Sequence, residues 1–237
     1  MSRPKLRMVA GPNGSGKTTL IQYLRDEFSL GHIQNPDEIE RQIAASGQFD
    51  LGLWEIACDL DVIEQFFAAH PLTAGKAPPI ISIQNTVMSI DRENVDGYFV
   101  SALCDFMRRQ WLITQQSFTV ETVMSHPDKP DLLREAHQQG YRTYLYYICT
   151  DSHRINEARV AARVSQGGHG VPEGKIAKRY ISSLGLLAEA IRHSSRAFLF
   201  DNSGKSHRFI AEYEENRLIR AMRDLPSWFV EAMLVER

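Results

Sequence analysis

The feature that most constrains this chain is a glycine-rich run near its start. The run reads Gly11-Pro12-Asn13-Gly14-Ser15-Gly16-Lys17-Thr18 and matches the pattern G-x-x-x-x-G-K-[ST] at every fixed position. Glycines here let consecutive backbone N–H groups turn towards phosphate oxygens, and a helix that begins directly afterwards adds its positive end. The run therefore predicts a phosphate-binding loop for ATP or GTP.

The residues on either side of the loop have the pattern that this mechanism requires. Residues 6–10 are typical of a short strand, and apolar residues recur at helical spacing from Leu20 to Phe28. We expect Lys17 to reach the β- and γ-phosphates and Thr18 to supply a hydroxyl for Mg²⁺. The expected nucleotide-binding residues are Gly11, Pro12, Asn13, Gly14, Ser15, Gly16, Lys17, Thr18 and Thr19.

Three further segments are typical of buried strands that end in polar residues. They are residues 117–120, followed by Glu121 and Thr122; residues 141–149, followed by Thr150 and Asp151; and residues 197–200, followed by Asp201, Asn202 and Ser203. Near-continuous apolar strands separated by helical stretches indicate a parallel sheet covered on both faces. The sequence predicts an α/β fold like that of P-loop NTPases and kinases, with helices on both faces of a parallel sheet and the ligand site at the carboxyl ends of the strands.

A long stretch after the first helix departs from this alternation. Residues 37–45, 53–69 and 100–112 are typical of helices, and residues 70–79 of a loop rich in proline and glycine. Residues 78–83 have the composition of a strand. We expect a mostly helical insert over about residues 38–115, which builds the pocket of a second substrate within a single domain of residues 1–237.

Residues 154–180, approximately, have the pattern of a lid. A helix over about residues 155–164 precedes a glycine-rich loop at 166–171, and residues 172–195 are predicted to form one long helix. Arg163 and Arg179 flank the loop, so we expect them to stabilise the transferred phosphoryl group. Arg159 is an alternative to Arg163, and a solvated helical face is the other interpretation of these arginines.

Composition argues against several other classes of protein. The net charge of −2 gives no reason to expect a nucleic-acid partner, and no apolar run approaches the roughly 18 residues of a membrane helix. The N-terminus runs directly into the first strand without a signal peptide, so we expect a cytoplasmic protein. Three widely separated cysteines, Cys58, Cys104 and Cys149, are expected to be reduced core residues.

Transfer of a phosphoryl group to a hydroxyl also needs a group that accepts the proton. The candidate is Asp37, in the segment Asn35-Pro36-Asp37-Glu38-Ile39 after the first helix. Because Pro36 favours an extended entry and Asp37 stands at the start of a helix, helix capping and general-base catalysis are both open for this residue.

Several motifs of this chain, taken in order, resemble those of the zeta-toxin family of P-loop kinases. They are the phosphate loop, the segment 35–39, the strand end at 117–122, Arg163 with the glycine loop, Lys178-Arg179-Tyr180, and residues 200–203. The resemblance implies that Lys17 holds ATP phosphates and that Asp37 is the general base. It also implies that Glu121 and Thr122 serve the substrate and the metal, and that Arg163 and Arg179 stabilise the transferred phosphate.

The resemblance further implies an enzyme that uses ATP and Mg²⁺ to phosphorylate a small-molecule hydroxyl. Zeta toxins of the plasmid-addiction type phosphorylate the 3′-hydroxyl of a UDP-activated amino sugar, such as UDP-N-acetylglucosamine, and are inhibited by a small helical antitoxin. This chain differs from that pattern in the glycine loop around His169 and in its insert. A P-loop nucleotide-binding protein or ATPase that acts on a nucleotide, a nucleic acid or a protein is the alternative.

Overall fold

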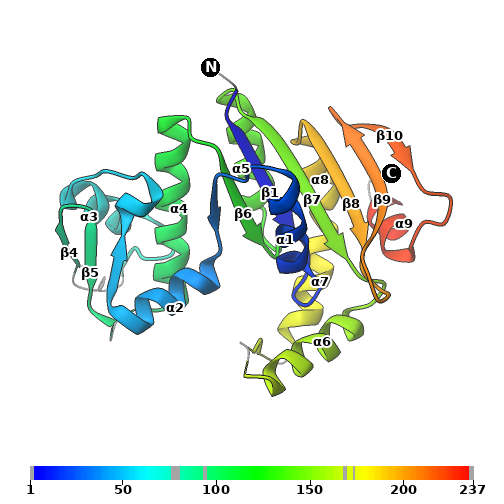
Figure 1. The fold of residues 1–237 in the computed structure, drawn as a ribbon, viewed down its shortest axis with the longest axis horizontal. Helices are drawn as coiled ribbons and strands as arrows, with labels where there is room; N and C mark the ends of the chain where they lie inside the picture. The colour runs from blue at the N-terminus through cyan, green and yellow to red at the C-terminus, as the bar shows by residue number, and fades with distance from the viewer. Residues whose placement is uncertain (1–2, 76–80, 93–94, 168–169, 173, 235–237) are drawn as a thin grey trace. The chain divides into compact units, whose positions relative to one another are not determined.

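Two compact units make up the chain. The computed structural model describes residues 3–75, 81–92, 95–167, 170–172 and 174–234. The first unit combines Met1–Ile33 with Ser117–Arg237, and the second is Gln34–Gln116. Each unit has its own sheet (Figure 1).

The first unit is organised around a seven-stranded sheet in the order β10-β9-β8-β7-β1-β6-β2 (Figure 1). β1, β6, β7 and β8 run parallel, whereas β9 and β10 are antiparallel to their neighbours. The strands are β1 (Lys5–Ala10), β2 (His32–Gln34), β6 (Phe118–Thr122), β7 (Arg142–Cys149), β8 (Arg196–Asp201), β9 (Arg208–Glu214) and β10 (Arg217–Ala221). The predicted α/β fold with a mostly parallel sheet is confirmed.

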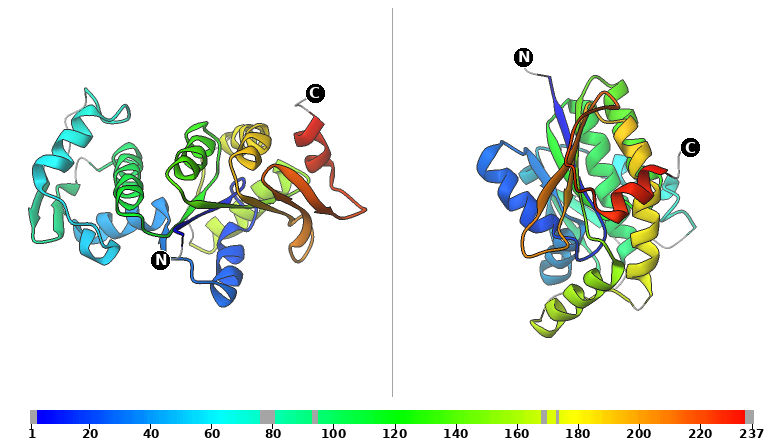
Figure 2. Two further views of the ribbon diagram at one scale, coloured as in Figure 1. Left: turned by 90° about the horizontal axis from the view of Figure 1, so that it is seen from above. Right: turned by 90° about the vertical axis from the view of Figure 1, so that its right-hand side faces the viewer.

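Helices cover both faces of this sheet. α1 (Lys17–Glu27) lies on one face, and α5 (Asp128–Gln138) and α8 (Leu187–Arg192) lie on the other (Figure 2). Buried side chains of α1 pack on those of β1 and β7. This hydrophobic cluster comprises Val9, Leu20, Ile21, Leu24, Leu30, Tyr146 and Ile148. The chain also forms α6 (His153–Ser165), α7 (Lys175–Gly185) and α9 (Ser227–Leu234). Among the helices of the described residues, none is both long and apolar enough to cross a membrane.

The single helix predicted over residues 172–195 is wrong. Gly174 has a left-handed backbone, with φ of 72°, and α7 begins only at Lys175. α7 ends at Gly185, and α8 begins at Leu187 after a break. Glycine is a poor helix former, so the interruption occurs where the helix is weakest.

The second unit packs helices against a small antiparallel sheet of order β3-β5-β4. Phe67 of α3 stacks on Phe99 of α4 with ring centroids 4.8 Å apart, and Trp111 of α4 is completely buried. Its elements are α2 (Pro36–Ser46), β3 (Gln48–Asp50), the 3₁₀ helix η1 (Leu51–Trp54), α3 (Leu60–Ala69), β4 (Ile81–Gln84), β5 (Val87–Ile90) and α4 (Gly97–Thr114).

Two expectations for this unit need correction. Residues 53–69 do not form one helix, because Glu55 turns left-handed after η1 and the carbonyl of Trp54 accepts a hydrogen bond from Trp111 Nε1 at 2.9 Å. The α-helix therefore begins only at Leu60. The strand expected at 78–83 corresponds to β4, although residues 78–80 lie outside the described residues. The sequence analysis missed β3 and β5.

The cysteines are free thiols, as expected, but differ in burial. Cys104 and Cys149 are buried, whereas Cys58 is only partly buried. Burial raises the pKa of the Cys149 thiol to about 12. This thiol is therefore protonated at neutral pH and acts as a core side chain.

Candidate nucleotide site

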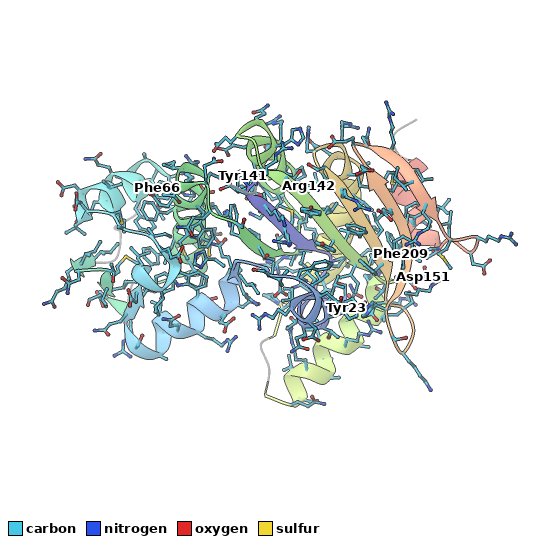
Figure 3. All side chains as sticks on the ribbon, turned by 45° about the horizontal axis from the view of Figure 1, so that its top comes forward. Tyr23, Phe66, Tyr141, Arg142, Asp151 and Phe209 are labelled. Carbon is cyan, nitrogen blue, oxygen red and sulfur yellow. The ribbon has the colours of Figure 1, made fainter. Side chains whose placement is uncertain are left out.

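The phosphate loop joins β1 to α1 at the carboxyl end of the strand. Figure 3 labels Arg142, the first residue of the neighbouring parallel strand β7, and Asp151, two residues beyond its last residue. Asp151 therefore lies near the carboxyl ends of the strands, where the loop also lies. α1 begins at Lys17, so the first backbone N–H groups of the helix have no partner within the helix. These donors and the positive end of the helix suit an anion.

Two glycines of the loop have left-handed backbones that disfavour any other residue. Gly11 has φ of 146°, and a Cβ there would also lie 2.0 Å from the backbone carbonyl oxygen of Ile148, so no side chain fits. Gly16 has φ of 104°, and a Cβ there would lie 2.4 Å from Nδ2 of Asn202, so a side chain would displace this carboxamide. Glycine adopts both backbone conformations without strain. The loop is therefore a cradle of backbone closely surrounded by other strand ends.

Lys17 places its ammonium group against the loop. The side chain is buried, and Nζ donates to the carbonyl oxygens of Gly11 at 2.9 Å and Pro12 at 3.1 Å. The carbonyl of Pro12 also accepts from the N–H of Ser15 at 3.2 Å. A buried cation held by neutral carbonyls is a suitable partner for phosphate oxygens, because a charged acceptor makes a stronger hydrogen bond.

Ser15 provides a second sign that the loop is built for a ligand. Its side chain is completely buried, and within the described part of the chain Oγ has no hydrogen-bond partner. Buried hydroxyl groups normally have a partner, so this one fits a site that a ligand oxygen completes. The loop thus fits the phosphates of a nucleotide.

Glu121 meets the phosphate loop from the adjacent strand. It lies opposite Val9 in the β1–β6 ladder, and its Oε1 accepts a hydrogen bond from Thr18 Oγ1 at 3.3 Å. A hydroxyl and a carboxylate oxygen side by side are ligands of the kind that Mg²⁺ prefers. These two residues would hold Mg²⁺ or a water bound to it.

Thr122 contributes to the loop through its backbone. Its carbonyl accepts from the N–H of Gly11 at 3.2 Å, and its hydroxyl accepts from the N–H of Met124 at 3.0 Å. Thr122 therefore fixes the entry to the loop and the turn after β6. Its predicted contact with substrate stays a prediction.

Asp37 belongs to the second unit, in the first turn of α2. The helix cap is Asn35, whose Oδ1 accepts from the N–H groups of Asp37 at 3.0 Å and Glu38 at 3.4 Å. Asp37 is exposed and is not the capping residue. The capping interpretation of Asp37 is therefore wrong, and general-base catalysis stays a prediction.

The two arginines predicted to act from the lid lie in different settings. Arg179 of α7 is partly buried, and its Nη1 donates to Asn13 Oδ1 at 3.4 Å, so it reaches the phosphate loop. Arg163 is exposed on the last turn of α6. Arg159 donates through Nη2 to the carbonyl of Gly204 at 3.1 Å. Gly168 and His169 of the predicted loop lie outside the described residues.

Comparison with known proteins supports this reading of the fold. No protein-family model matches the sequence, and no curated protein matches it. Among solved structures, a chain of the AvrRxo1-ORF1:-ORF2 complex with ATP aligns with 91% of this chain at 15% identity and a TM-score of 0.57. The alignment covers 60% of that chain, so the present chain spans less than two thirds of its length. The same complex with sulphate ions aligns with 97% of this chain and 63% of its own, at 14% identity and a TM-score of 0.59.

A second similarity is to the PezAT chromosomal toxin–antitoxin system of Streptococcus pneumoniae. It covers 97% of this chain and 77% of the other, at 12% identity and a TM-score of 0.51. The chain shares its fold with these proteins. The resemblance stated from the sequence is thus confirmed for the fold.

Two asparagines lie against the phosphate loop in ways that the sequence analysis missed. Asn202 donates through Nδ2 to the carbonyl of Ser15 at 2.8 Å. Asn156 of α6 is completely buried, and its backbone carbonyl oxygen lies 2.7 Å from the position that a Cβ on Gly14 would occupy. The polar strand end at residues 201–203 was a usable signal for Asn202, whereas Asn156 gave none because it lies within a predicted helix.

Proposed function

We propose that this chain is an ATP-dependent kinase that transfers the γ-phosphoryl group to the hydroxyl of a small molecule. The observation that carries the proposal is the phosphate loop itself. It combines a buried Lys17 ammonium, a buried Ser15 hydroxyl without a partner in the described part of the chain, and the Thr18–Glu121 pair. Each of these groups suits one part of a Mg²⁺-bound triphosphate.

The proposed mechanism assigns one role to each residue. Lys17 and the backbone N–H groups of the loop would hold the β- and γ-phosphates, and Thr18 and Glu121 would hold Mg²⁺. Mg²⁺, when bound, neutralises charge on the phosphate oxygens. Arg179, with Arg163, stabilises the charge on the transferred group.

Asp37 accepts the proton in this mechanism. As the acceptor oxygen forms its bond to the γ-phosphorus, the bond from that phosphorus to the β,γ-bridging oxygen breaks. ADP leaves with the electron pair of the broken bond, and the acceptor proton passes to the Asp37 carboxylate.

For the acceptor we propose a UDP-activated amino sugar, phosphorylated on the sugar 3′-hydroxyl, with Thr122 among the residues that contact it. The support is the resemblance of the motifs to zeta toxins and the similarity of the fold to proteins described as toxin–antitoxin partners. The same similarity supports an antitoxin-like protein partner.

A phosphorylation screen tests the proposal. Purified protein is incubated with radiolabelled ATP and Mg²⁺ together with UDP-sugars, nucleosides and other small hydroxyl compounds, and mass spectrometry identifies any phosphorylated product. Lys17→Ala is the matched control, because it removes the buried ammonium and should abolish transfer. Hydrolysis of ATP without an acceptor product, or transfer to a nucleic acid or protein, would favour the alternative function.

A further inference from the structure

Asn202 connects three parts of the nucleotide site. It follows β8 directly, and its backbone N–H donates to the carbonyl of Cys149 at the end of β7, at 2.7 Å. Its side-chain Nδ2 donates to the carbonyl of Ser15 in the phosphate loop at 2.8 Å. The residue is half-buried. The backbone of Asn202 is therefore hydrogen-bonded to the sheet, and its side-chain carboxamide is hydrogen-bonded to the phosphate loop.

This contact determines which way one peptide group of the loop points. The described residues contain no cis peptide bond, so the carbonyl of Ser15 and the N–H of Gly16 point in opposite directions. Asn202 holds the carbonyl outwards, on the side of β8. The N–H of Gly16 therefore points away from Asn202, as a phosphate-binding donor must.

The absence of a side chain at Gly16 allows the carboxamide of Asn202 to approach the carbonyl of Ser15. A Cβ at residue 16 would lie 2.4 Å from Nδ2 of Asn202, and the left-handed φ of 104° disfavours any other residue. A side chain at residue 16 would therefore displace the carboxamide of Asn202 from the carbonyl of Ser15.

We infer that Asn202 is a positioning residue for the phosphate loop, which orients the Ser15–Gly16 peptide so that its N–H donates to a nucleotide phosphate. The inference rests on the proposed nucleotide-binding function and adds a residue to it. Asn202 acts through the loop backbone and does not itself need to touch the nucleotide.

The rest of the loop after β8 has supports of its own, so the inference can be tested cleanly. Ser203 Oγ donates to Asp201 Oδ1 at 2.6 Å and accepts from the N–H of Asp151 at 2.8 Å. Arg159 of α6 donates to the carbonyl of Gly204 at 3.1 Å. These bonds do not involve the Asn202 side chain, and its truncation should leave the loop in place.

The test compares Asn202→Ala with Ser203→Ala in the full chain. Titration calorimetry measures affinity for Mg²⁺ with a non-hydrolysable ATP analogue and for ADP, and ligand-observed NMR measures affinity for adenosine, which has no phosphate. One neutral hydrogen bond is worth about 0.5–1.5 kcal/mol. We therefore expect Asn202→Ala to weaken the analogue and ADP roughly 3- to 10-fold and to leave adenosine unchanged. Ser203→Ala removes hydrogen bonds from the same loop and should leave the affinities for the ATP analogue and for ADP unchanged.

The outcomes separate this inference from the proposed function. Wild-type protein that binds no nucleotide would refute both. Wild-type binding that is unchanged in Asn202→Ala refutes the inference alone, as does an equal loss for adenosine and for the phosphate-bearing ligands. If Asn202→Ala does not fold, Asn202→Leu keeps a similar side-chain shape without the donor and is measured in the same way.

Discussion

The hydroxyl of Thr18, in the first turn of α1, lies 3.3 Å from a carboxylate oxygen of Glu121 near the end of β6. The two residues are far apart in the sequence and are brought together because β1 and β6 are adjacent parallel strands, with Val9 opposite Glu121. A carboxylate that already orients the hydroxyl prepares both oxygens for a divalent cation.

Substitutions in this pair should weaken Mg²⁺ binding more than nucleotide binding. We expect Thr18→Val and Glu121→Gln each to raise the Mg²⁺ concentration needed for tight binding of an ATP analogue by about 10-fold or more. Calorimetric titrations at several Mg²⁺ concentrations provide the measurement. Equal affinity at every concentration would show that the pair does not serve the metal.

Asp37→Asn should separate catalysis from folding. Because Asn35 provides the helix cap, loss of the Asp37 carboxylate should leave the melting temperature and ATP affinity close to those of the wild type. A positioned general base contributes roughly 10²–10⁴-fold in rate, so transfer to the true acceptor should fall by that factor. Wild-type turnover in this variant would exclude Asp37 as the base and make Glu121 the next carboxylate to test.

Arg179→Ala should slow phosphoryl transfer more than Arg154→Ala. Arg179 contacts Asn13 in the phosphate loop, whereas Arg154 is exposed at the start of α6. Loss of a donor aimed at developing charge costs roughly 10²-fold or more in kcat. Single-turnover rates of the two variants are compared. Equal rates would show that Arg179 does not stabilise the charge on the transferred group.

Hydrogen exchange should divide the predicted lid into a fixed part and a closing part. α7 is anchored to the sheet, because Tyr180 donates to the carbonyl of Thr150 at 2.6 Å and the hydroxyls of Tyr147 and Ser183 lie 3.1 Å apart. We expect α7 to be protected with and without nucleotide. Residues 161–167, which are exposed and include Arg163, should gain protection when an ATP analogue is added. Identical exchange in both states would mean that this segment does not close.

Asp201 should make part of the stability sensitive to acid. Burial acts to raise the pKa of this carboxyl, but hydrogen bonds from Ser203, Trp228 and Arg208 outweigh burial and lower the pKa below its ordinary value of 3.8. The stabilisation is therefore complete above the ordinary pKa and is lost as the pH falls through the lower, folded-state pKa.

Urea unfolding as a function of pH tests this prediction. Asp201→Asn should reduce the free energy of unfolding by about 2 kcal/mol at pH 7, because hydrogen bonds to a charged group are the stronger kind. The difference from the wild type should shrink below about pH 4. Asp224→Asn, at an exposed carboxyl, is the matched control. A difference that does not change with pH would remove the ionised carboxylate from the explanation.

The parts of the fold that the sequence predicted are those with strong local signals. The glycines and Lys17 identify the phosphate loop, and continuous apolar runs identify β6, β7 and β8. The errors have tertiary causes. The periodicity favours a helix at Trp54, but the carbonyl of Trp54 accepts a hydrogen bond from the indole of Trp111 instead. Gly174 has a left-handed backbone, so α7 begins only at the next residue. The polar strand end at residues 201–203 points to Asn202 as a residue near the site, but its contact with Ser15 spans most of the chain, so no local pattern indicates which residue it contacts.

The position of β1 between two strands that come much later in the sequence also affects how the chain folds as it leaves the ribosome. β1 is made well before its partners β6 and β7, which begin at Phe118 and Arg142. The apolar strand must therefore stay unpaired during synthesis of more than the next hundred residues, a period in which wrong pairing and aggregation are real hazards. The loop's own supports, Asn156, Arg179 and Asn202, are translated later still. A nascent chain that stalls before Asn202 would carry the complete glycine motif but would lack the side chain that donates to the carbonyl of Ser15.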